Sequence, residues 1–444
     1  LSSLALGVFL FLHMTIQEIH HLFLESDGIS TDTRAIRKNT LFFALKGANF
    51  NGNTFADQAL VSGASYAFVD EEAFDTGDKT ILVTDVLKTL QELAYIHRKY
   101  LDIPILALTG SNGKTTTKEL INKVLSKKFN TTATQGNLNN HIGVPLTLLS
   151  MTKNTQIGIV EMGANHIGEI AELAAIAAPD FGYITNFGKA HLEGFGSVEG
   201  VIQGKSELYE YLIAHKGTLF LNLDDPIQAK KVKSTHSFCF SAFEDADTKI
   251  VYQEAQPFAN FEFDDLHVQS NLMGQYNTIN LAAAATIGMF FKIDKTAIKE
   301  ALESYIPTNN RSQIINKGKQ TIILDAYNAN PTSMAAALQN FSALKGANRI
   351  AFLGDMFELG DTAHEEHQII ADTCANLNID YTVFLGKNFS KVKTSGYKYE
   401  NLEALENLGF PEVLQDKLKE ATILIKGSRG MKLEGLLDLL ESDN

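Results

Sequence analysis

The sequence predicts a three-domain α/β protein, and two observations support this prediction. The chain has 444 residues, more than the roughly 100 to 200 residues that one ordinary core organises. Short apolar segments alternate with helical segments through most of the chain, and this alternation is typical of doubly wound, mostly parallel sheets. We expect a small N-terminal α/β domain at residues 14–101, a central doubly wound domain at 102–306 and a C-terminal Rossmann-like domain at 307–444.

The order of elements follows from the apolar runs. In the N-terminal domain, buried strands are expected at residues 40–45 and 66–69, with Gly and Asn turns between them. In the central domain, strands and helices are expected to alternate at residues 105–109, 115–126, 156–161, 166–177, 181–185 and 198–212. The segment 239–270 is β-like and weakly periodic, which favours a side hairpin before a helix at 277–289 closes the domain.

The C-terminal domain repeats the alternation. Strands are expected at residues 321–324, 350–353, 382–385 and 422–425, and helices at 334–344, 363–375 and 433–440. The sequence has no internal repeat and no low-complexity tract. The alternation itself is therefore the evidence for a third α/β domain.

Composition excludes several classes of protein. A content of 45% apolar and 20% charged residues argues against a disordered chain, a coiled coil or a collagen-like fibre. The net charge of −14 argues against nucleic acid as the main partner, because nucleic acid selects for clustered basic charge. Cys239 and Cys374 are 135 positions apart in the chain and form neither a metal-type pair nor a disulfide framework, so we expect a cytoplasmic location.

The first residues are treated separately. The apolar run at residues 4–12 is far shorter than the roughly 20 residues that span a bilayer. No Lys or Arg precedes Arg34, so the start does not resemble a secretory signal. We expect no membrane span, and we expect residues 1–13 to be a non-native extension ahead of a natural start at Met14.

The strongest chemical signal is a glycine-bounded loop between the strand at 105–109 and the helix at 115–126. Its candidate nucleotide-binding residues are Gly110, Ser111, Asn112, Gly113, Lys114, Thr115 and Thr116. Glycines let backbone N–H groups surround phosphate oxygens, a lysine reaches the β- and γ-phosphates, and a following hydroxyl binds Mg²⁺. Leu108 stands where the standard pattern has its first glycine, so this is a shorter G-x-x-G-K-T loop. We expect Lys114 on a solvent-facing loop.

Three further residues of the central domain are candidates for chemistry. Glu161 ends the strand at 156–161, where a carboxylate faces the ligand crevice of an open sheet, and His191 follows the strand at 181–185. Either residue can be structural instead, as a surface salt bridge or as a core histidine. On spacing alone Lys205 is interpreted as a solvated lysine of the helix at 198–212.

One apparent metal motif is set aside. The run His-Glu-Glu-His at residues 364–367 lacks the second histidine at the position that a metalloprotease requires, where Gln368 stands. We expect these residues to form the polar first turn of a helix after Asp361.

Ordered motifs along the chain resemble the Mur ligases, the ATP-dependent amide-forming enzymes of peptidoglycan precursor synthesis. The resemblance runs from residue 15 to residue 440. It rests on the segments 110–116, 136–145, 161–163, 185–193, 274–280, 325–331, 353–356, 358–360 and 426–430. Asn-Ala-Asn-Pro at 328–331 and Gly-Asp-Met at 354–356 are similar to the members that add D-alanyl-D-alanine, and not to those that add glutamate or a diamino acid.

The resemblance implies roles for residues around ATP. It implies a Mg²⁺ site made by Thr115, Glu161, His191 and Lys205, with Lys205 carbamylated. It assigns catalysis to Lys114 together with Glu161, His191 and Lys205. It places Asn277 and Asn280 near the adenine, and it implies that Arg311 and Asp325 reach the nucleotide from the C-terminal domain.

The resemblance also implies a substrate-binding role for the N-terminal domain, which would grip the UDP end. The substrate-binding residues that it implies are Thr31, Asp32, Thr33, Arg34, Lys46, Asn139, Asn140, Asn328 and Asn330. At residues 50–53 the chain has Phe-Asn-Gly-Asn, where the family more often has Asp-Gly-His. UDP contacts at residues 51–53 are therefore left open.

The implied reaction joins D-alanyl-D-alanine to UDP-N-acetylmuramoyl-tripeptide through an acyl phosphate, the last cytoplasmic amino-acid addition in peptidoglycan precursor synthesis. ATP and Mg²⁺ are the implied cofactors, and the partners are these small molecules. The C-terminal domain would close to exclude water from the acyl phosphate. We expect a monomer, and the sequence leaves open whether the third residue of the tripeptide is diaminopimelate or lysine.

Two rival functions are weighed against this one. A folylpolyglutamate synthase belongs to the same superfamily but is not expected to carry the UDP-binding domain before residue 100. A nucleotide-gated regulatory protein that hydrolyses ATP slowly would have no use for Glu161, His191 and the acceptor motifs.

Overall fold

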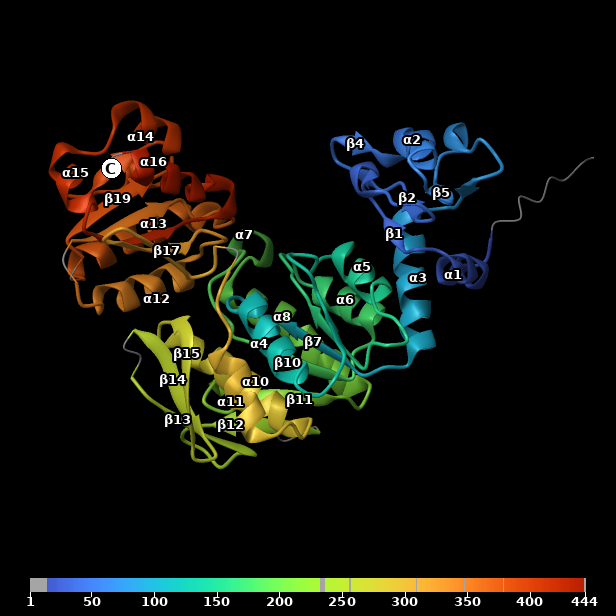
Figure 1. Ribbon diagram of the computed structural model, residues 1–444, viewed down its shortest axis with the longest axis horizontal. Coiled ribbons are helices and arrows are strands. Elements are labelled where there is room, and N and C mark those ends of the chain that lie inside the picture. The colour runs from blue at the N-terminus through green and yellow to red at the C-terminus, as the bar shows by residue number, and fades with distance from the viewer. Residues whose placement is uncertain are drawn as a thin grey trace, which may run out of the picture. The chain divides into compact units, whose positions relative to one another are not determined.

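The computed structural model describes residues 14–231, 236–254, 257–308, 310–346, 348–377 and 379–442 (Figure 1). The expected extension at residues 1–13 lies outside the described residues. The chain divides into two compact units. The first contains residues up to 105 with 132–160 and 172–178, and the second contains 106–131, 161–171 and the chain from 179 onward. The mixed α/β class is confirmed, whereas the three-domain layout stays a proposal.

A parallel sheet of the order β1-β2-β5-β6 organises the start of the first unit. Its strands are β1 (Ile29–Ser30), β2 (Leu41–Phe43), β5 (Tyr66–Val69) and β6 (Thr80–Leu82), and a separate hairpin joins β3 (Lys46–Gly47) and β4 (Phe50–Asn51). The strand predicted at 66–69 is confirmed, and the one predicted at 40–45 is shorter. Phe42, Ala67 and Val69 pack against α2 (Ala56–Val61), because alternate residues of a strand face the same side.

Two helices of the first unit, at residues 16–25 and 86–101, were not predicted. α1 (Ile16–Glu25) starts at a capping box in which the Thr15 hydroxyl accepts the Glu18 amide, and α3 (Val86–Leu101) is the longer of the two. His20 of α1 and His97 of α3 are both buried, with His20 Nε2 3.2 Å from His97 Nδ1. The first unit also contains α5 (Gly143–Leu149).

The large sheet of the second unit runs in the order β15-β14-β13-β12-β11-β10-β7. Its strands are β7 (Ile105–Thr109), β10 (Phe181–Ile184), β11 (Thr218–Asn222), β12 (Ser237–Ser241), β13 (Thr248–Tyr252), β14 (Phe258–Phe263) and β15 (Leu266–Met273). The strands from β7 to β13 pair in parallel, and β14 and β15 are antiparallel. β8 (Thr131–Ala133) and β9 (Ile157–Glu161) are neighbours of each other.

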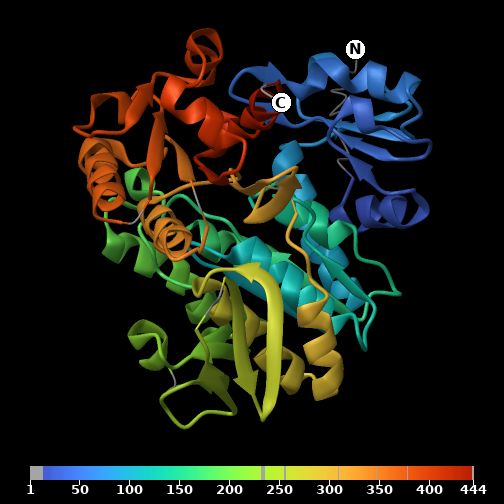
Figure 2. The same ribbon diagram turned by 60° about the vertical axis from the view of Figure 1, so that its left-hand side comes forward.

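The side hairpin expected at 239–270 is wrong in its placement. β13, β14 and β15 continue the edge of the large sheet (Figure 2), with Phe240 of β12 opposite Thr248 of β13. Ala259, Phe261 and Phe263 are buried whereas the residues between them are partly exposed. One face of β14 packs against α10 (Tyr276–Phe290), and this one-sided burial is typical of antiparallel strands.

In the described part of the central region, the four predicted helices are present at residues 114–125, 169–177, 198–214 and 276–290, and the other helices were not predicted. Together these helices are α4 (Lys114–Leu125), α6 (Glu169–Ala177), α7 (Leu192–Phe195), α8 (Val198–Ala214), α9 (Pro226–Ala229), α10 and α11 (Lys295–Glu303). The helix predicted at 166–177 starts later, at Glu169. The Glu169 carboxylate accepts the amides of Asn165 and His166 at 2.6 and 3.2 Å, and this local turn replaces the first helical turn.

The C-terminal sheet has the order β16-β17-β21-β18-β19-β20. Its strands are β16 (Gln313–Lys317), β17 (Gln320–Asp325), β18 (Arg349–Gly354), β19 (Tyr381–Leu385), β20 (Tyr397–Tyr399) and β21 (Thr422–Lys426). The four predicted strands are confirmed as β17, β18, β19 and β21. The edge strands β16 and β20 were not predicted, because they are mostly partly exposed and carry no continuous apolar run.

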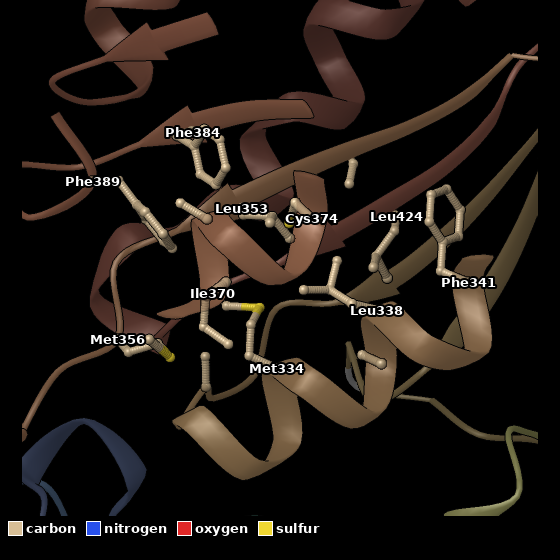
Figure 3. Packing of buried hydrophobic residues seen from close by; sticks show 14 of the residues in the cluster. Met334, Leu338, Phe341, Leu353, Met356, Ile370, Cys374, Phe384, Phe389 and Leu424 are labelled. Carbon is tan, nitrogen blue, oxygen red and sulfur yellow. The ribbon is translucent and has the colours of Figure 1, made fainter. Parts of the chain in front are cut away.

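Helices cover both faces of this sheet. They are α12 (Pro331–Ser342), α13 (Ala363–Asn376), α14 (Leu402–Leu408), α15 (Glu412–Leu418) and α16 (Leu436–Ser442). On one face Leu338 and Phe341 of α12 pack with Leu353 and Leu424 (Figure 3). On the other face Phe352 packs with residues of α14, α15 and α16. Neighbouring residues of one strand thus serve two cores, which is why the central strands are continuous apolar runs.

No helix within the described ranges is long and apolar enough to cross a membrane.

The core shown in Figure 3 gives a stability prediction. Leu338 is completely buried, so Leu338→Ala should lower the free energy of unfolding by about 2 to 5 kcal/mol through lost burial and a residual cavity. Leu408 at the end of α14 is 77% exposed, and Leu408→Ala should change the same free energy by less than about 0.5 kcal/mol. Urea titration followed by far-UV circular dichroism measures the free energy of unfolding of both variants. Equal losses for the two variants would contradict the assigned core.

Candidate functional site

The loop between β7 and α4 has a positive-φ backbone, which favours glycine, at two positions. Gly110 and Gly113 have φ angles of +143° and +78°. A Cβ at Gly110 would lie 2.0 Å from Thr185 Oγ1, and a Cβ at Gly113 would lie 2.8 Å from Asn280 Oδ1. The two glycines of the sequence motif are therefore required both by the left-handed backbone and by close neighbours.

Hydrogen bonds from the loop after β10 hold this turn in shape. Asn186 accepts the Ser111 amide on its backbone oxygen at 3.0 Å and the Asn112 amide on its side-chain oxygen at 3.1 Å. The Ser111 hydroxyl donates to the Gly188 carbonyl at 2.9 Å. α4 has no side-chain cap, so the amides of its first turn are available to an anion. This arrangement has the features that a phosphate site requires, and phosphate binding itself stays a prediction.

Lys114 is the first residue of α4, and its expected position on a solvent-facing loop is wrong. The side chain is half-buried, and Nζ donates to the Gly110 carbonyl at 2.7 Å and to the Ser111 carbonyl at 3.4 Å. Burial lowers the pKa of Lys114, while Glu161 opposes this effect and Arg311 adds to it. The ammonium group is thus folded back over the phosphate loop.

Thr115 and Glu161 meet next to this loop. The Thr115 hydroxyl donates to Glu161 Oε1 at 3.2 Å, and both side chains are buried. Hydroxyl and carboxylate oxygens are the hard donors that Mg²⁺ prefers, and Mg²⁺ usually takes few protein ligands besides phosphates and waters. The pair therefore fits the predicted metal. Among the described residues no three His, Cys, Asp or Glu side chains gather closely enough to hold a metal ion.

In the structure His191 contacts Glu358, a residue that was not predicted to be its partner. His191 has a left-handed backbone, with φ of +53°, directly before α7. Its Nδ1 forms a hydrogen bond with the Glu358 carboxylate, and the Glu193 amide donates to the Glu358 carbonyl at 3.2 Å. The hydrogen bond from His191 holds the pKa of Glu358 below its usual value. That His191 shares a metal with Glu161 stays a prediction.

Lys205 is completely buried, so the interpretation as a solvated helix lysine is wrong. Its Nζ donates to the Ala164 carbonyl at 2.9 Å and lies 4.9 Å from the centroid of the Phe195 ring. Burial, and after it the charge of Lys114, hold the pKa of Lys205 well below its usual value. The site therefore favours the neutral amine.

The sequence contained a signal for this burial. Val201, Leu208 and Leu212 are buried on α8, and Lys205 lies on the same helical stripe at positions i, i+4, i+7 and i+11. A lysine in such a stripe can pack its aliphatic stem against the core, although its ammonium group usually reaches water. The spacing therefore made burial of Lys205 possible, but it did not decide it.

Asn277 and Asn280 of α10 lie beneath the phosphate loop. Asn280 Nδ2 donates to Asn277 Oδ1 at 2.9 Å, Asn280 Oδ1 accepts the Thr117 hydroxyl at 3.1 Å, and Asn277 Nδ2 donates to the Met273 carbonyl at 2.8 Å. Both amides are buried. They join α10 to α4 and support Gly113, and their contact with adenine stays a prediction.

Arg311 lies just before β16, and Asp325 is the last residue of β17. The Arg311 guanidinium lies 3.5 Å from the centroid of the Tyr327 ring. Asp325 accepts the Ser312 amide at 3.0 Å and pairs with Lys426 Nζ at 2.5 Å, with the Lys426 side chain 3% exposed. Neither a role for Lys426 nor its buried ion pair with Asp325 was predicted.

Three family models together cover most of the chain. Residues 25–107 match a model described as the Mur ligase family catalytic domain, residues 108–288 match the Mur ligase middle domain, and residues 310–429 match the Mur ligase glutamate ligase domain. A protein of Bacillus subtilis named UDP-N-acetylmuramoyl-tripeptide--D-alanyl-D-alanine ligase is 34% identical over 94% of this chain and 93% of its own length.

The chain belongs to the Mur ligase family.

Other relatives also align over nearly the whole length of this chain. The Escherichia coli protein of the same name is 33% identical over 94% of each chain. Among solved structures, MurF from Acinetobacter baumannii has a TM-score of 0.84 and 30% identity over 96% of this chain and 98% of that one. A MurF ligase from Thermotoga maritima in complex with ADP has a TM-score of 0.81 and 26% identity over 95% and 98%.

In this Mur ligase the segment 31–34 forms a compact turn in the first unit. Asp32 caps the 3₁₀ helix of Thr33–Ala35 and accepts Arg34 Nε at 2.9 Å and Arg34 Nη2 at 2.6 Å. The hydrogen bonds from Arg34 lower the pKa of Asp32 to about 2. Thr31 and Thr33 are partly exposed, and the Arg34 side chain is largely exposed. The role of these four residues toward UDP stays a prediction.

Lys46 is an exposed member of a polar cluster around the largely buried carboxylate of Asp70. Lys46 Nζ lies 3.0 Å from Asp70 Oδ1, and the hydrogen bond with Asp70 raises the pKa of Lys46. Asn53, at the position where the sequence departs from the family pattern, is completely buried, donates to Asp70 Oδ1 at 2.8 Å and accepts the Asp70 amide at 3.0 Å. Asn53 therefore has a structural role in this chain.

The remaining asparagines predicted to bind substrate lie at two places. Asn139 and Asn140 precede α5 of the first unit, where Asn140 Oδ1 accepts the Gly143 amide at 2.9 Å. In the second unit, Asn328 is exposed, and the buried Asn330 caps α12 and donates to Asn112 Oδ1 at 2.7 Å. The Asn330 contact connects the phosphate loop with the segment 328–331.

The apparent metal motif at residues 364–367 lies in the first turn of α13, as expected. Buried His367 accepts the Met356 amide on Nε2 at 3.0 Å and donates from Nδ1 to the Ala363 carbonyl at 2.6 Å. Glu366 pairs with Lys189 at 2.6 Å. Both ring nitrogens of His367 are therefore engaged with the backbone.

The close approach at Gly113 gives a binding prediction. Gly113→Ala should weaken ATP binding by about tenfold or more, because the new Cβ would press on Asn280 and the left-handed backbone would be strained. Gly136 also has a positive φ of +54° but has open space around its Cβ, so Gly136→Ala separates backbone strain from steric contact. Fluorescent-nucleotide titration measures both. An unchanged dissociation constant for Gly113→Ala would contradict the assigned loop.

Proposed function

We propose that this Mur ligase joins D-alanyl-D-alanine to UDP-N-acetylmuramoyl-tripeptide with hydrolysis of ATP to ADP and phosphate. The observation that carries the proposal is that relatives with that name are 33 and 34% identical over nearly the whole length of both chains. The ADP complex of the Thermotoga maritima relative supports the use of ATP, and so does the geometry of the 110–116 loop.

The proposed chemistry has two steps. The terminal carboxylate of the tripeptide attacks the γ-phosphorus of ATP, and ADP leaves to give an acyl phosphate. The amine of D-alanyl-D-alanine then attacks the acyl carbon, and the tetrahedral intermediate collapses with loss of inorganic phosphate and a proton. No side-chain nucleophile is needed, so the protein acts by positioning and electrostatics.

Residues around the loop supply those electrostatics. The first-turn amides of α4 would bind phosphate oxygens, and Lys114, now folded onto Gly110 and Ser111, would turn outward to offset charge on the transferring phosphoryl group. Thr115 and Glu161 would hold Mg²⁺. The ion, when bound, would supply further positive charge at the phosphates.

Lys205 is proposed to carry a carbamate. Its burial, with one carbonyl acceptor, favours a neutral amine and outweighs the opposing charges of Glu169 and Glu207. The neutral amine is the form that attacks CO₂. A bond forms between Nζ and the carbon of CO₂, and one N–H proton is lost. The product is an anion with oxygen donors in a place where an ammonium group would repel a metal.

We further propose roles for three segments of the chain. Residues 14–101 would bind the UDP end of the substrate, 102–306 would bind ATP, and 307–444 would bind the incoming dipeptide and exclude water from the acyl phosphate. His191, Asn277, Asn280, Arg311 and Asp325 keep their predicted roles at the metal and the nucleotide. A cytoplasmic location and a monomeric state also remain proposals.

The rival functions have less support. A folylpolyglutamate synthase from Mycobacterium tuberculosis has a TM-score of 0.60 but only 13% identity, and this likeness concerns the fold alone. A slow regulatory ATPase would not explain why Lys205 is buried beside the loop that follows Glu161.

The proposed reaction predicts which substrates release phosphate. With ATP present, the protein should release phosphate rapidly only when UDP-N-acetylmuramoyl-tripeptide and D-alanyl-D-alanine are supplied together, because each completes one step. D-Glutamate or a diamino acid in place of the dipeptide should give a much lower rate. Lys114→Ala is the control, with an expected loss in kcat on the order of 10². Equal release with D-glutamate would assign the chain to another branch of the family.

The carbamate predicts the behaviour of two Lys205 variants. Lys205→Ala and Lys205→Arg should both lose most activity while ATP binding persists, because neither side chain can form the carbamate. Short-chain carboxylic acids should restore part of the activity of Lys205→Ala by supplying an anion in the vacated space. Steady-state kinetics and nucleotide titration measure these effects. Turnover of Lys205→Arg at the native rate would remove the carbamate role.

A further inference from the structure

The loop between β9 and α6, residues 162–168, is fixed to α8 at two places. Near its start, the Ala164 carbonyl accepts Lys205 Nζ at 2.9 Å. At its end, the Glu207 carboxylate accepts the Gly168 amide on Oε1 at 2.6 Å and the Ala171 amide on Oε2 at 2.9 Å. Lys205 and Glu207 are two positions apart on α8, so one stretch of helix holds both ends of the loop.

Glu207 is more than an ordinary helix cap. Glu207 is 8% exposed, and its carboxylate caps α6 from a different helix. Burial of a carboxylate is costly unless both of its oxygens are paired. Gly168 has a left-handed φ of +97° with open space around its Cβ. The loop backbone therefore takes a conformation that the two Glu207 contacts stabilise.

The start of the loop, at Met162 directly after Glu161, is also held by β7. The Met162 amide donates to the Leu108 carbonyl at 2.8 Å, and the Thr109 hydroxyl donates to the Met162 carbonyl at 2.7 Å. The position of the Ala164 carbonyl is thus set from the β7 side through Met162 and from the α8 side through Glu207.

We propose that Glu207 is a positioning residue for Lys205, because it holds the loop so that the Ala164 carbonyl orients the carbamate. This inference rests on the proposed function. Carbamylation forms a bond between Nζ and the carbon of CO₂ and releases one proton, so Nζ keeps one N–H. That N–H donates to the Ala164 carbonyl and fixes the rotation about the Lys205 side chain. The new carboxylate then has a single direction in which to extend.

The experiment compares Glu207→Gln with a matched control. A glutamine at 207 can accept one of the two amides, and its own NH₂ opposes the other, so the loop should loosen. Asp225 caps α9 by accepting the amides of Ile227 and Gln228 and has no contact with the 162–168 loop in the described structure. Asp225→Asn therefore reports what the loss of a capping charge does to stability alone.

Three measurements are made on each variant: thermal midpoint, steady-state kinetics and the carbamate signal in ¹³C NMR after incubation with ¹³C-bicarbonate. For Glu207→Gln we expect a kcat lower by about tenfold, a KM for ATP within about threefold of native and a weaker or shifted carbamate signal. Asp225→Asn should lower the thermal midpoint and leave the other two readouts native. Gly168→Ala, which strains the same loop from its own side, should behave as Glu207→Gln does.

The outcomes separate this inference from the proposed function. Native kcat and a native carbamate signal in Glu207→Gln, with only a lower thermal midpoint, would overturn the positioning role. If the unaltered enzyme gave no carbamate signal and Lys205→Ala turned over normally, the carbamate proposal itself would fail. Inactive Lys205→Ala together with a native Glu207→Gln would overturn the positioning role alone.

Discussion

The contact between Gly113 and Asn280 is the constraint on which the candidate site depends. A side chain at Gly113 would collide with Asn280, and Asn280 is itself fixed by Thr117 of α4 and Asn277 of α10. The phosphate loop, the first turn of α4 and α10 therefore share one buried hydrogen-bond network. Such a network fixes one geometry, because any member left without its partner would pay the cost of desolvation.

The candidate site also contains several buried ionisable residues. Glu161, Lys205 and Glu207 are all removed from solvent, and each has a polar partner: the Thr115 hydroxyl, the Ala164 carbonyl and two backbone amides. Burial of ionisable groups is costly without such partners. Buried ionisable groups of this kind are more frequent at functional sites than elsewhere, which is consistent with the proposed chemistry.

The phosphate loop and the loop after β10 both make polar contacts with the part of the chain that follows residue 310. Asn112 accepts from Asn330, Lys189 pairs with Glu366, and His191 bonds Glu358. Hydrogen bonds and ion pairs of this kind are weak compared with an apolar core. Polar contacts of this kind are consistent with the proposed closure that would exclude water from the acyl phosphate.

The sequence by itself determined the parts that depend on local pattern. The apolar runs of β5, β7 and β21 and the Gly-x-x-Gly-Lys-Thr turn were predictable, because strand burial and a left-handed turn leave direct marks in residue type. Only the tertiary structure decided that Lys205 is buried, that Glu358 meets His191 and that Asn53 supports Asp70. The partners in these contacts are separated along the chain. The residue type of a polar side chain does not indicate whether that side chain faces water or a distant partner. The fold alone supplies that partner, and with it the chemistry of the site.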